Sequence, residues 1–184
     1  VGALRESCDV YFYEVAQRIG IDGIFAMNDR LGLGQKYDLP LSGMARGNNP
    51  SRDWKQKKYG QDWLIGDTIN ASIGQGFTLA SPIQLATMVA RLSSGTAVLP
   101  RMVRSISGTS TENSAPASLG LSAEALSIVR QGMFEVSNHE RGTAYASRIA
   151  DPTKVMAGKT GSSQVFSISA AERAAGVRSQ DELP

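Results

Sequence analysis

The sequence holds little cysteine, little histidine and no long hydrophobic run, and each shortage excludes a class of protein. Among its 184 residues are one cysteine, Cys8, and one histidine, His139. One cysteine excludes an internal disulfide framework, and a single Cys/His pair supplies too few ligands for a zinc cluster, so we expect no metal and no other cofactor. No apolar run reaches the ~18 residues that indicate a membrane-spanning helix. A net charge of +2 gives no general attraction to nucleic acid or to anionic lipid.

The composition is that of a globular domain, but neither end of the chain reads as the end of a fold. A hydrophobic content of 41% and a charged content of 20% are ordinary for a globular protein. The first residues, from Val1, show neither an initiating methionine nor a signal-peptide pattern. The last residues, up to Pro184, show no completing element. We therefore expect residues 1–184 to be part of a single larger domain.

Hydrophobic periodicity predicts four helices. Apolar side chains recur at the i, i+3, i+4 and i+7 spacing of one helix face. The helices are expected from directly after Asp9 to Gly20, over 21–31, over 82–94 and over 123–137. Ser81 and Ser122 are N-cap residues for the last two. Gly32 and Gly95 stand where helices should end.

The rest of the chain is predicted to be connectors with one good strand. Residues 32–66 are rich in Gly, Pro, Asn and Asp, which predicts a long connector. Residues 96–106 are expected to be extended, and Pro100 within them favours an edge strand. Loops or linkers are expected over 107–120 and 169–184. Residues 155–168 are the best strand candidate. Mostly helices with one strong strand is an unusual inventory for a complete domain, which favours a partial one.

A basic and aromatic stretch lies within the predicted connector. Arg52 and the lysines at positions 55, 57 and 58 interleave with Trp54 and Tyr59. Such interleaving can bind single-stranded nucleic acid, because its bases stack on aromatic rings. Charges in a polar connector are more simply explained as a solvated loop. We prefer that interpretation and expect no nucleic-acid partner.

The most informative motif is Lys159-Thr160-Gly161, followed by Ser162, at the entry to the predicted strand. A lysine ammonium there stabilises negative charge and shifts the proton affinity of nearby hydroxyls. Thr160 and Ser162 lie two residues apart, so both hydroxyls would share one strand face and could bind a substrate carboxylate. Gly161 would let a substrate backbone approach the strand, and the Ser162 N–H could be an oxyanion donor.

This motif has three interpretations. It is one of three signatures of enzymes that acylate a serine with penicillin-like substrates. It could also be an ordinary strand with a solvated lysine. A phosphate-binding loop is the third, because Gly158-Lys159-Thr160 matches the last three positions of such a loop. That loop needs a glycine where Thr153 stands and a helix after it, whereas the following residues favour a strand.

Of the other two signatures of the serine-acylating enzymes, one has a candidate in this sequence and the other is absent. Ser7-Cys8-Asp9 is close to Ser-x-Asn, and the Ser7 hydroxyl could relay a proton between a lysine and a leaving group. Ser and Asp before a helix are also ordinary N-caps. Ser-x-x-Lys, which supplies the nucleophile, does not occur. The residues three before the six lysines are Leu33, Arg52, Trp54, Lys55, Asp151 and Met156.

Longer segments give these motifs a common context. They cover residues 7–13, 66–86, 142–145 and 156–165. In this order they resemble the transpeptidase domain of class B penicillin-binding proteins, specifically the elongation-type penicillin-binding protein 2 group, over nearly the whole chain. The chain departs from the family pattern at Asp9, where many relatives have Asn, and in the missing Ser-x-x-Lys.

The resemblance implies an α/β (α+β) fold, namely a partial serine β-lactamase/penicillin-binding transpeptidase fold with an antiparallel sheet between helices. This chain would supply the helical wall of the cleft and the active-site strand. The implied reaction is D,D-transpeptidation, in which a serine acyl-enzyme crosslinks peptidoglycan stem peptides that end in D-Ala-D-Ala, and β-lactams would acylate the same serine. The catalytic residues would be Ser7, Asp9 and Lys159, and the substrate-binding residues Thr160, Gly161 and Ser162.

The resemblance also implies parts and partners outside the chain. A Ser-x-x-Lys segment would precede it, further strands and a helix would follow, and an inner-membrane anchor would place the catalytic domain in the periplasm. A lipid-II glycosyltransferase of the elongation complex would be its partner. The chain alone is expected not to acylate, and unpaired strand edges would favour its aggregation. Two alternatives are a non-catalytic penicillin-fold scaffold, which an upstream Ser-x-x-Lys would exclude, and a β-lactam-hydrolysing relative.

Overall fold

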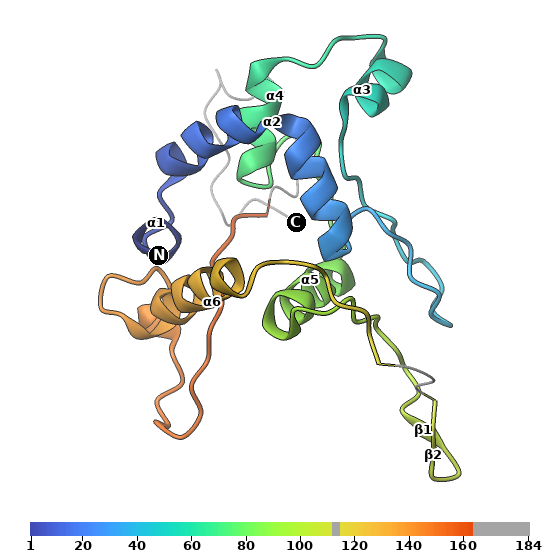
Figure 1. The fold of residues 1–184 in the computed structure, drawn as a ribbon, viewed down its shortest axis with the longest axis vertical. Helices are drawn as coiled ribbons and strands as arrows, with labels where there is room; N and C mark the ends of the chain where they lie inside the picture. The colour runs from blue at the N-terminus through green and yellow to red at the C-terminus, as the bar shows by residue number, and fades with distance from the viewer. Residues whose placement is uncertain (112–114, 164–184) are drawn as a thin grey trace, which may run out of the picture.

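The structure, a computed structural model, describes residues 1–111 and 115–163. Its described part is largely helical, with one small antiparallel hairpin (Figure 1). The helices are α1 Gly2–Arg5, α2 Asp9–Leu31, α3 Arg52–Tyr59, α4 Ile65–Ser72, α5 Pro82–Ser94, α6 Ala123–Asn138 and the 3₁₀ helix η1 Tyr145–Ser147. The strands are β1 Ser105–Ile106 and β2 Thr109–Ser110. Helix α2 packs against α4 and α5, and α6 packs against α1 and α5.

Helix α2 bends at Gly20, where the backbone leaves the helical region with φ 73° and ψ 168°. The predicted end of a helix at Gly20 and the predicted second helix over 21–31 are both confirmed, but a kink joins them and no loop intervenes (Figure 1). At the far end Gly32 adopts a left-handed C-cap with φ 94°. The buried Tyr37 hydroxyl donates to the Gly32 carbonyl at 2.8 Å and closes this end.

Helices α5 and α6 begin and end close to the predicted residues. In α6 the Ser122 hydroxyl accepts a hydrogen bond from the Ala125 N–H at 3.0 Å, as an N-cap should. In α5 the Ser81 N–H is bound instead by the Gln84 side-chain oxygen at 3.0 Å. The Ser81 hydroxyl is buried and has no partner among the described residues. The helix over 82–94 is thus confirmed, but the Ser81 hydroxyl does not cap it; the Gln84 side chain binds the backbone N–H of Ser81 instead.

The prediction of a connector over 32–66 is wrong for its second part, which holds α3 and the start of α4. The Ser51 hydroxyl caps α3 by accepting from the Trp54 N–H at 3.1 Å. One turn later, Lys55 Nζ lies 2.6 Å from Asp67 Oδ2, and the Lys55 side chain is 4% exposed. Because this buried ion pair joins two segments that are not neighbours in sequence, local composition could not predict it.

The basic and aromatic stretch forms helix α3 and is not a solvated loop, so that interpretation is wrong. Lys58 Nζ lies 5.0 Å from the ring centroid of Trp54 and 5.4 Å from that of Tyr59. The Trp54 ring is 5.3 Å from the Phe77 ring, centroid to centroid. These contacts seat α3 on the segment after α4, which accounts for the aromatic residues without a ligand. The expected lack of a nucleic-acid partner stays a prediction.

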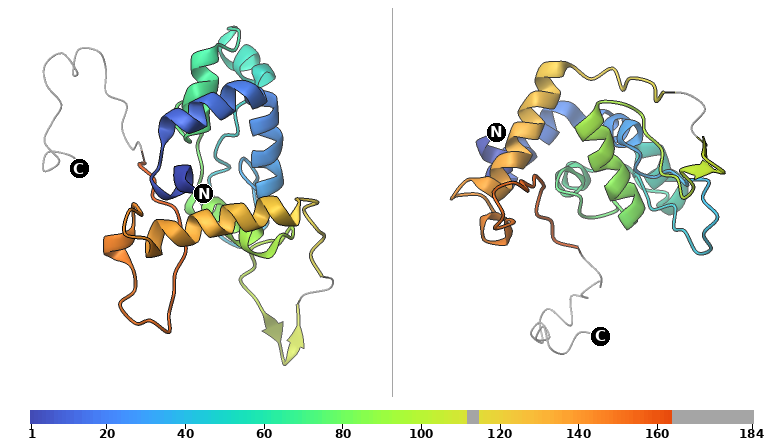
Figure 2. Two further views of the ribbon diagram at one scale, coloured as in Figure 1. Left: turned by 60° about the vertical axis from the view of Figure 1, so that its left-hand side comes forward. Right: turned by 90° about the horizontal axis from the view of Figure 1, so that it is seen from below.

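The segment after α5 runs outward into the hairpin of β1 and β2, which projects from the body of the molecule in Figures 1 and 2. It begins with an isolated antiparallel bridge between Thr96 and Ser118. The hairpin turns at Ser107 and Gly108, which adopt φ 49° and φ 83°, as the tight turns of hairpins require. The predicted extended segment over 96–106 therefore includes a strand, and the predicted loop after it includes β2.

The prediction of a strand over 155–168 is wrong for residues 155–163, which form no strand in the structure. A strand needs a neighbour for its ladder of hydrogen bonds, and these residues lie beside α6 instead. The Gly158 N–H donates to the Met133 carbonyl at 3.0 Å, and Asn138 Nδ2 donates to the Met156 carbonyl at 2.9 Å. Residues 164–168 and the predicted linker over 169–184 lie outside the described residues.

Buried polar side chains join the helices as much as apolar ones do. The buried apolar residues are Ala16, Ile21, Leu31, Leu33, Tyr37, Ala71, Leu119, Leu126 and Val136. Gln84 is completely buried and donates to the carbonyls of Gln35 and Arg46, both at 2.7 Å. Arg91 is 5% exposed and donates to the Arg30 carbonyl at 2.8 Å, at the C-terminal end of α2, where the helix dipole favours a cation. None of the described helices combines the length and the apolar character needed to cross a bilayer.

Candidate active site

Ser7 lies on the turn between α1 and α2, in a backbone conformation unusual for a residue with a side chain. Its φ is 52°, in the left-handed region that non-glycine residues seldom occupy. The turn is closed by the Cys8 N–H, which donates to the Ala3 carbonyl at 2.9 Å. The N-cap of α2 is Cys8, and no side chain caps this helix. The interpretation of Ser7 and Asp9 as ordinary N-caps is therefore wrong.

The Ser7 hydroxyl instead faces Lys159, from the other end of the chain. Lys159 Nζ donates to Ser7 Oγ, across 152 residues of sequence. The same ammonium donates to the Thr160 carbonyl at 3.0 Å and to Thr160 Oγ1 at 3.2 Å. The structure thus brings together two of the three predicted catalytic residues, and it places the first predicted substrate-binding hydroxyl beside them.

Thr143 is a third hydroxyl at this site, and the residue-level prediction missed it. Its Oγ1 lies 2.8 Å from Thr160 Oγ1 and 3.5 Å from Ser7 Oγ, and Thr160 Oγ1 lies 3.4 Å from Ser7 Oγ. We call Ser7, Thr143 and Thr160 the hydroxyl cluster. The segment over 142–145 was recognised as similar to the family, which was the available signal. Its side-chain contact with Ser7 was not predictable, because 136 residues separate the two.

Gly161 and Ser162 continue the segment away from the hydroxyl cluster. A side chain at Gly161 would meet no atom within 4 Å, so its face is open. The Ser162 carbonyl accepts a hydrogen bond from Gln75 Nε2 at 3.1 Å. Gln75 lies on the tight turn of Gly74 and Gly76, which adopt φ 75° and φ 72°. This turn therefore acts as a structural support for the segment that carries Lys159.

Asp9 acts on Lys159 through space. It is the first residue of α2, and among the described residues no hydrogen bond or ion pair joins it to Lys159. Partial burial lowers the pKa of the Lys159 amine, and the negative charge of Asp9 partly opposes this change. The Lys159 ammonium therefore loses its proton more readily than the ammonium of a fully exposed lysine.

The hydroxyl cluster and the Lys159 ammonium form a polar patch suited to an anion. Three hydroxyls can donate to a carboxylate while the ammonium supplies the positive charge. Nothing in the described part of the chain groups three or more His, Cys, Asp or Glu side chains as a metal site would need. His139 lies at the C-cap of α6, where its Nδ1 accepts from the Arg141 N–H at 3.0 Å, so it is a structural residue of the helix end.

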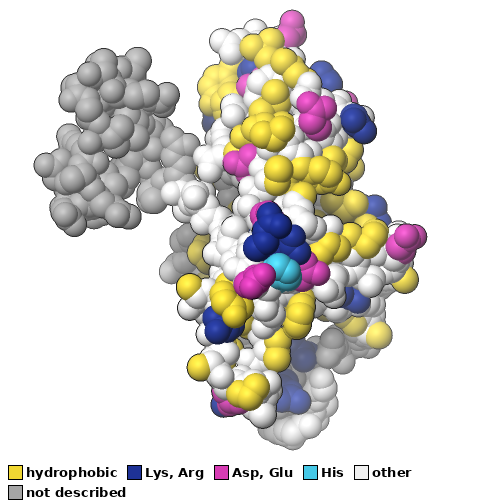
Figure 3. Space-filling view, turned by 90° about the vertical axis from the view of Figure 1, so that its left-hand side faces the viewer, with side chains coloured by type: hydrophobic (Ala, Val, Ile, Leu, Met, Phe, Trp, Pro, Cys, Tyr) yellow, Lys and Arg dark blue, Asp and Glu magenta, His cyan; other side chains and the backbone are white. Residues whose placement is uncertain are grey.

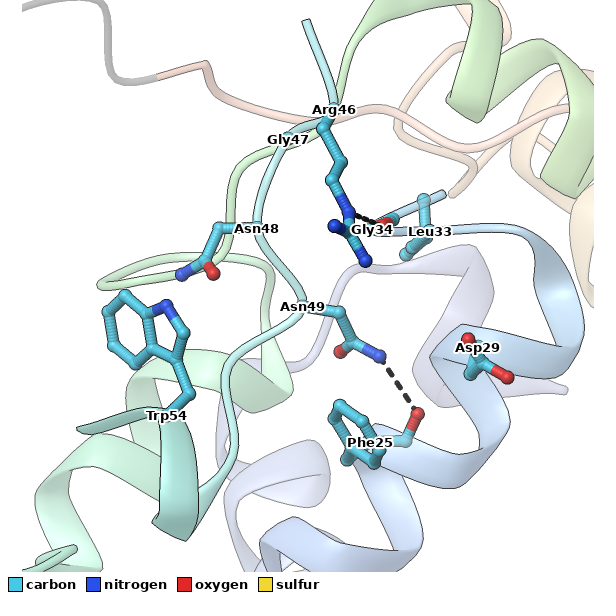
Figure 4. Close-up of a pocket in the computed structure, with 9 residues that line it drawn as sticks. All are labelled: Phe25, Asp29, Leu33, Gly34, Arg46, Gly47, Asn48, Asn49 and Trp54. Atoms are coloured by element: carbon cyan, nitrogen blue, oxygen red, sulfur yellow. Dashed lines mark hydrogen bonds between the residues drawn. The ribbon is translucent and has the colours of Figure 1, made fainter. Parts of the chain in front are cut away.

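A hollow of about 400 Å³ lies elsewhere, at the end of α2 (Figure 4). Its polar groups are used within the protein: Asn49 Nδ2 donates to the Phe25 carbonyl at 3.0 Å, and Arg46 Nε donates to the Gly34 carbonyl at 3.0 Å. None of the hydroxyl cluster lines this hollow. We therefore place the candidate active site at the hydroxyl cluster and not at the hollow.

Comparisons with known proteins show which family the chain resembles. The family model for the penicillin binding protein transpeptidase domain matches residues 1–177. The peptidoglycan D,D-transpeptidase MrdA of Salmonella typhimurium is 36% identical over 173 residues, which cover 90% of this chain and 28% of that protein.

Two solved structures resemble the chain in sequence and in fold. The penicillin-binding protein PBP2 of Pseudomonas aeruginosa, in complex with WCK 5153, is 38% identical with a TM-score of 0.79 and matches 89% of this chain and 38% of that chain. PBP2 of Helicobacter pylori, in complex with MreC, is 34% identical with a TM-score of 0.76 and matches 89% of this chain and 30% of that chain.

The chain thus spans 28% of the length of the curated relative that it matches. The structural matches confirm the predicted partial α/β fold, and helices are the main regular elements of the described residues. The order of the motifs and the extent of the match leave one assignment: this chain belongs to the penicillin-binding protein transpeptidase domain family.

Proposed function

We propose that the protein containing this chain is a peptidoglycan D,D-transpeptidase, which crosslinks stem peptides through a serine acyl-enzyme and is acylated by β-lactams. The observation that carries this proposal is the contact of Lys159 Nζ with both Ser7 Oγ and Thr160 Oγ1. It unites two signatures of serine-acylating enzymes in one place. Sequence similarity to proteins named for this activity supports the same conclusion.

The residues of this chain would bind the substrate and move protons. The Thr160 and Thr143 hydroxyls would donate to the terminal carboxylate of D-Ala-D-Ala, and the Lys159 ammonium would balance its charge. Ser7 would pass a proton from the attacking serine to the leaving amine. Gly161 would leave room for the peptide backbone, and the Ser162 N–H would donate to the oxyanion. Asp9 would tune the charge of Lys159 from a distance.

The nucleophile would be the serine of a Ser-x-x-Lys segment, which this chain lacks. Its oxygen would form an ester with the penultimate D-Ala carbonyl carbon, and the amide C–N bond would break. The released D-Ala would take up the proton that the serine lost. In the second step an amine of a neighbouring stem would attack the ester, form the new amide and return a proton to the serine.

The setting of this activity is also part of the proposal. Because the reaction acts on peptidoglycan, the catalytic domain would lie in the periplasm, held by an inner-membrane anchor outside this chain. The relative from Helicobacter pylori was solved in complex with MreC. We infer that this protein works in a comparable assembly of the elongation machinery, alongside a lipid-II glycosyltransferase.

Intact-mass spectrometry with benzylpenicillin tests the proposal. The full-length gene product and this 184-residue chain are incubated with the drug in parallel. We expect one adduct per molecule on the full-length protein, mapped to a serine that precedes Val1, and none on the chain alone. A folded full-length protein without an adduct would support a non-catalytic scaffold instead. Rapid release of benzylpenicilloate would indicate a hydrolase.

A further inference from the structure

Four charged side chains beside the hydroxyl cluster form a continuous network across three segments. Arg5 of α1 lies 2.5 Å from Glu6 through Nη2 and 3.0 Å from Glu135 of α6 through Nη1. Arg141, in the loop after α6, lies 2.6 Å from the other oxygen of Glu6. Basic and acidic side chains gather beside the histidine on this face (Figure 3). Glu6 therefore bridges two arginines.

The network joins the two segments that carry Ser7 and Thr143. Glu6 directly precedes Ser7, and Arg141 stands two residues before Thr143. The ion pair between Glu6 and Arg141 thus joins the same two segments whose hydroxyl oxygens, on Ser7 and Thr143, lie 3.5 Å apart. A backbone hydrogen bond runs beside it, from the Thr143 N–H to the Arg5 carbonyl at 3.2 Å. The ion pair is therefore one of the contacts that join the two segments carrying these hydroxyls.

The Ser7 turn needs such support, because a left-handed backbone at a residue with a side chain persists only where its surroundings hold it. The loop that carries Thr143 is already seated on α6. The Ala144 N–H donates to the Val136 carbonyl at 3.0 Å, and a side chain at Gly142 would collide with the carbonyls of Glu135 and Val136. With one segment fixed on α6, the ion pair ties the other to it.

The charges favour a network that is ionised at neutral pH. The hydrogen bond from Arg5 lowers the pKa of Glu6, and Arg141 adds to this effect, while partial burial opposes it. The two members of the Glu6–Arg141 ion pair differ in exposure: the Glu6 side chain is 32% exposed and that of Arg141 is 65% exposed. Truncation of Arg141 should therefore remove the ion pair without disturbing the packing of α6.

We propose that Glu6 and Arg141 are positioning residues, whose ion pair holds Ser7 against Thr143 and so sets the geometry of the hydroxyl cluster. Neither residue belongs to that cluster, and each acts through the residue that follows it closely in sequence. The inference rests on the proposed function, because its effect is read out as acylation.

The test compares variants of the intact protein that contains this chain, in their reaction with benzylpenicillin. Arg141→Ala and Glu6→Gln break the ion pair, and Arg141→Lys keeps its charge. Glu140→Gln is the matched control, because Glu140 is exposed and has no hydrogen bond or ion pair among the described residues. The quantities measured are the dissociation constant of the non-covalent complex, the first-order acylation constant, the fraction of protein acylated and the thermal midpoint.

We expect Arg141→Ala and Glu6→Gln to lower the first-order constant about 10-fold to 100-fold, the loss that a misplacement of about 1 Å produces. Arg141→Lys should keep most of the rate, and Glu140→Gln should behave as wild type. The acylated fraction and the thermal midpoint of Arg141→Ala should not change. A merely structural role would lower that fraction and the midpoint instead of the rate constant of the folded protein.

Three results would overturn the inference, and they are distinguishable. If the wild type and Arg141→Ala are acylated with equal first-order constants, the positioning role is refuted and the proposed function stays in place. A rate loss in Arg141→Ala that tracks a lowered thermal midpoint and that Arg141→Lys does not restore would have the same consequence. A folded wild type that forms no adduct would overturn the proposed function, and the inference with it.

Discussion

Removal of the Thr143 hydroxyl is the sharpest test of the site geometry. Thr143 was not among the predicted site residues, yet its Oγ1 lies 2.8 Å from that of Thr160. Thr143→Val keeps the shape of the side chain and removes only the hydroxyl. If this hydroxyl donates to the substrate carboxylate, its loss removes a hydrogen bond to a charged group, which contributes about 1.5–3 kcal/mol. At about 1.4 kcal/mol per factor of ten, the affinity should fall ~10-fold to ~150-fold.

The site is exposed, so we expect the lower end of that range, about 10-fold. The assay is the concentration dependence of benzylpenicillin acylation in the intact protein. The dissociation constant of the non-covalent complex should rise while the first-order acylation constant changes little, because the lost interaction holds ground state and transition state alike. Thr143→Ser should retain the affinity. Thr109→Val, on the distant hairpin, is the matched control. An unchanged dissociation constant in Thr143→Val would refute the assignment.

Three further predictions concern stability, protonation and backbone fit. Lys55→Ala should lower the free energy of unfolding by about 3 kcal/mol, the lower end for a buried pair, because it leaves the partly buried Asp67 carboxylate without its cation. Urea unfolding beside the exposed control Lys57→Ala checks this, and equal losses would contradict it. Partial burial lowers the pKa of Lys159, so the protonated lysine destabilises the folded state. This destabilisation decreases as the pH rises through the folded-state pKa. Over the same range the ammonium is lost, so acylation should fall on the alkaline side, and Lys159→Arg should move that fall to higher pH; superimposable pH profiles would count against an ammonium role. Gly142→Ala should lower the acylation rate at least 10-fold, since its methyl group meets carbonyls of α6 and must displace the loop; a variant with wild-type kinetics would show that the loop position does not matter.

Local sequence was sufficient for the boundaries of α2, α5 and α6. Ser122 before α6, Gly20 within α2 and Gly32 after it act through contacts within a few residues, and such contacts follow from residue type and spacing. The Lys-Thr-Gly motif and the Ser7 triplet also predicted two segments that the structure brings into contact. The order of the longer segments was enough to predict the family.

Only the tertiary structure decided what depends on residues far apart in the chain. Composition predicted a loop where α3 forms, because Lys55 finds its partner Asp67 on another helix. No local pattern placed Thr143 next to Ser7, or paired Glu6 with Arg141. The predicted strand shows the same limit, since a strand becomes one only when a neighbour pairs with it. The sequence by itself determined which residues could do the chemistry. The packing of α1 against α6 determined which of them meet, because it brings together residues more than a hundred positions apart in the chain, which no local interaction can do.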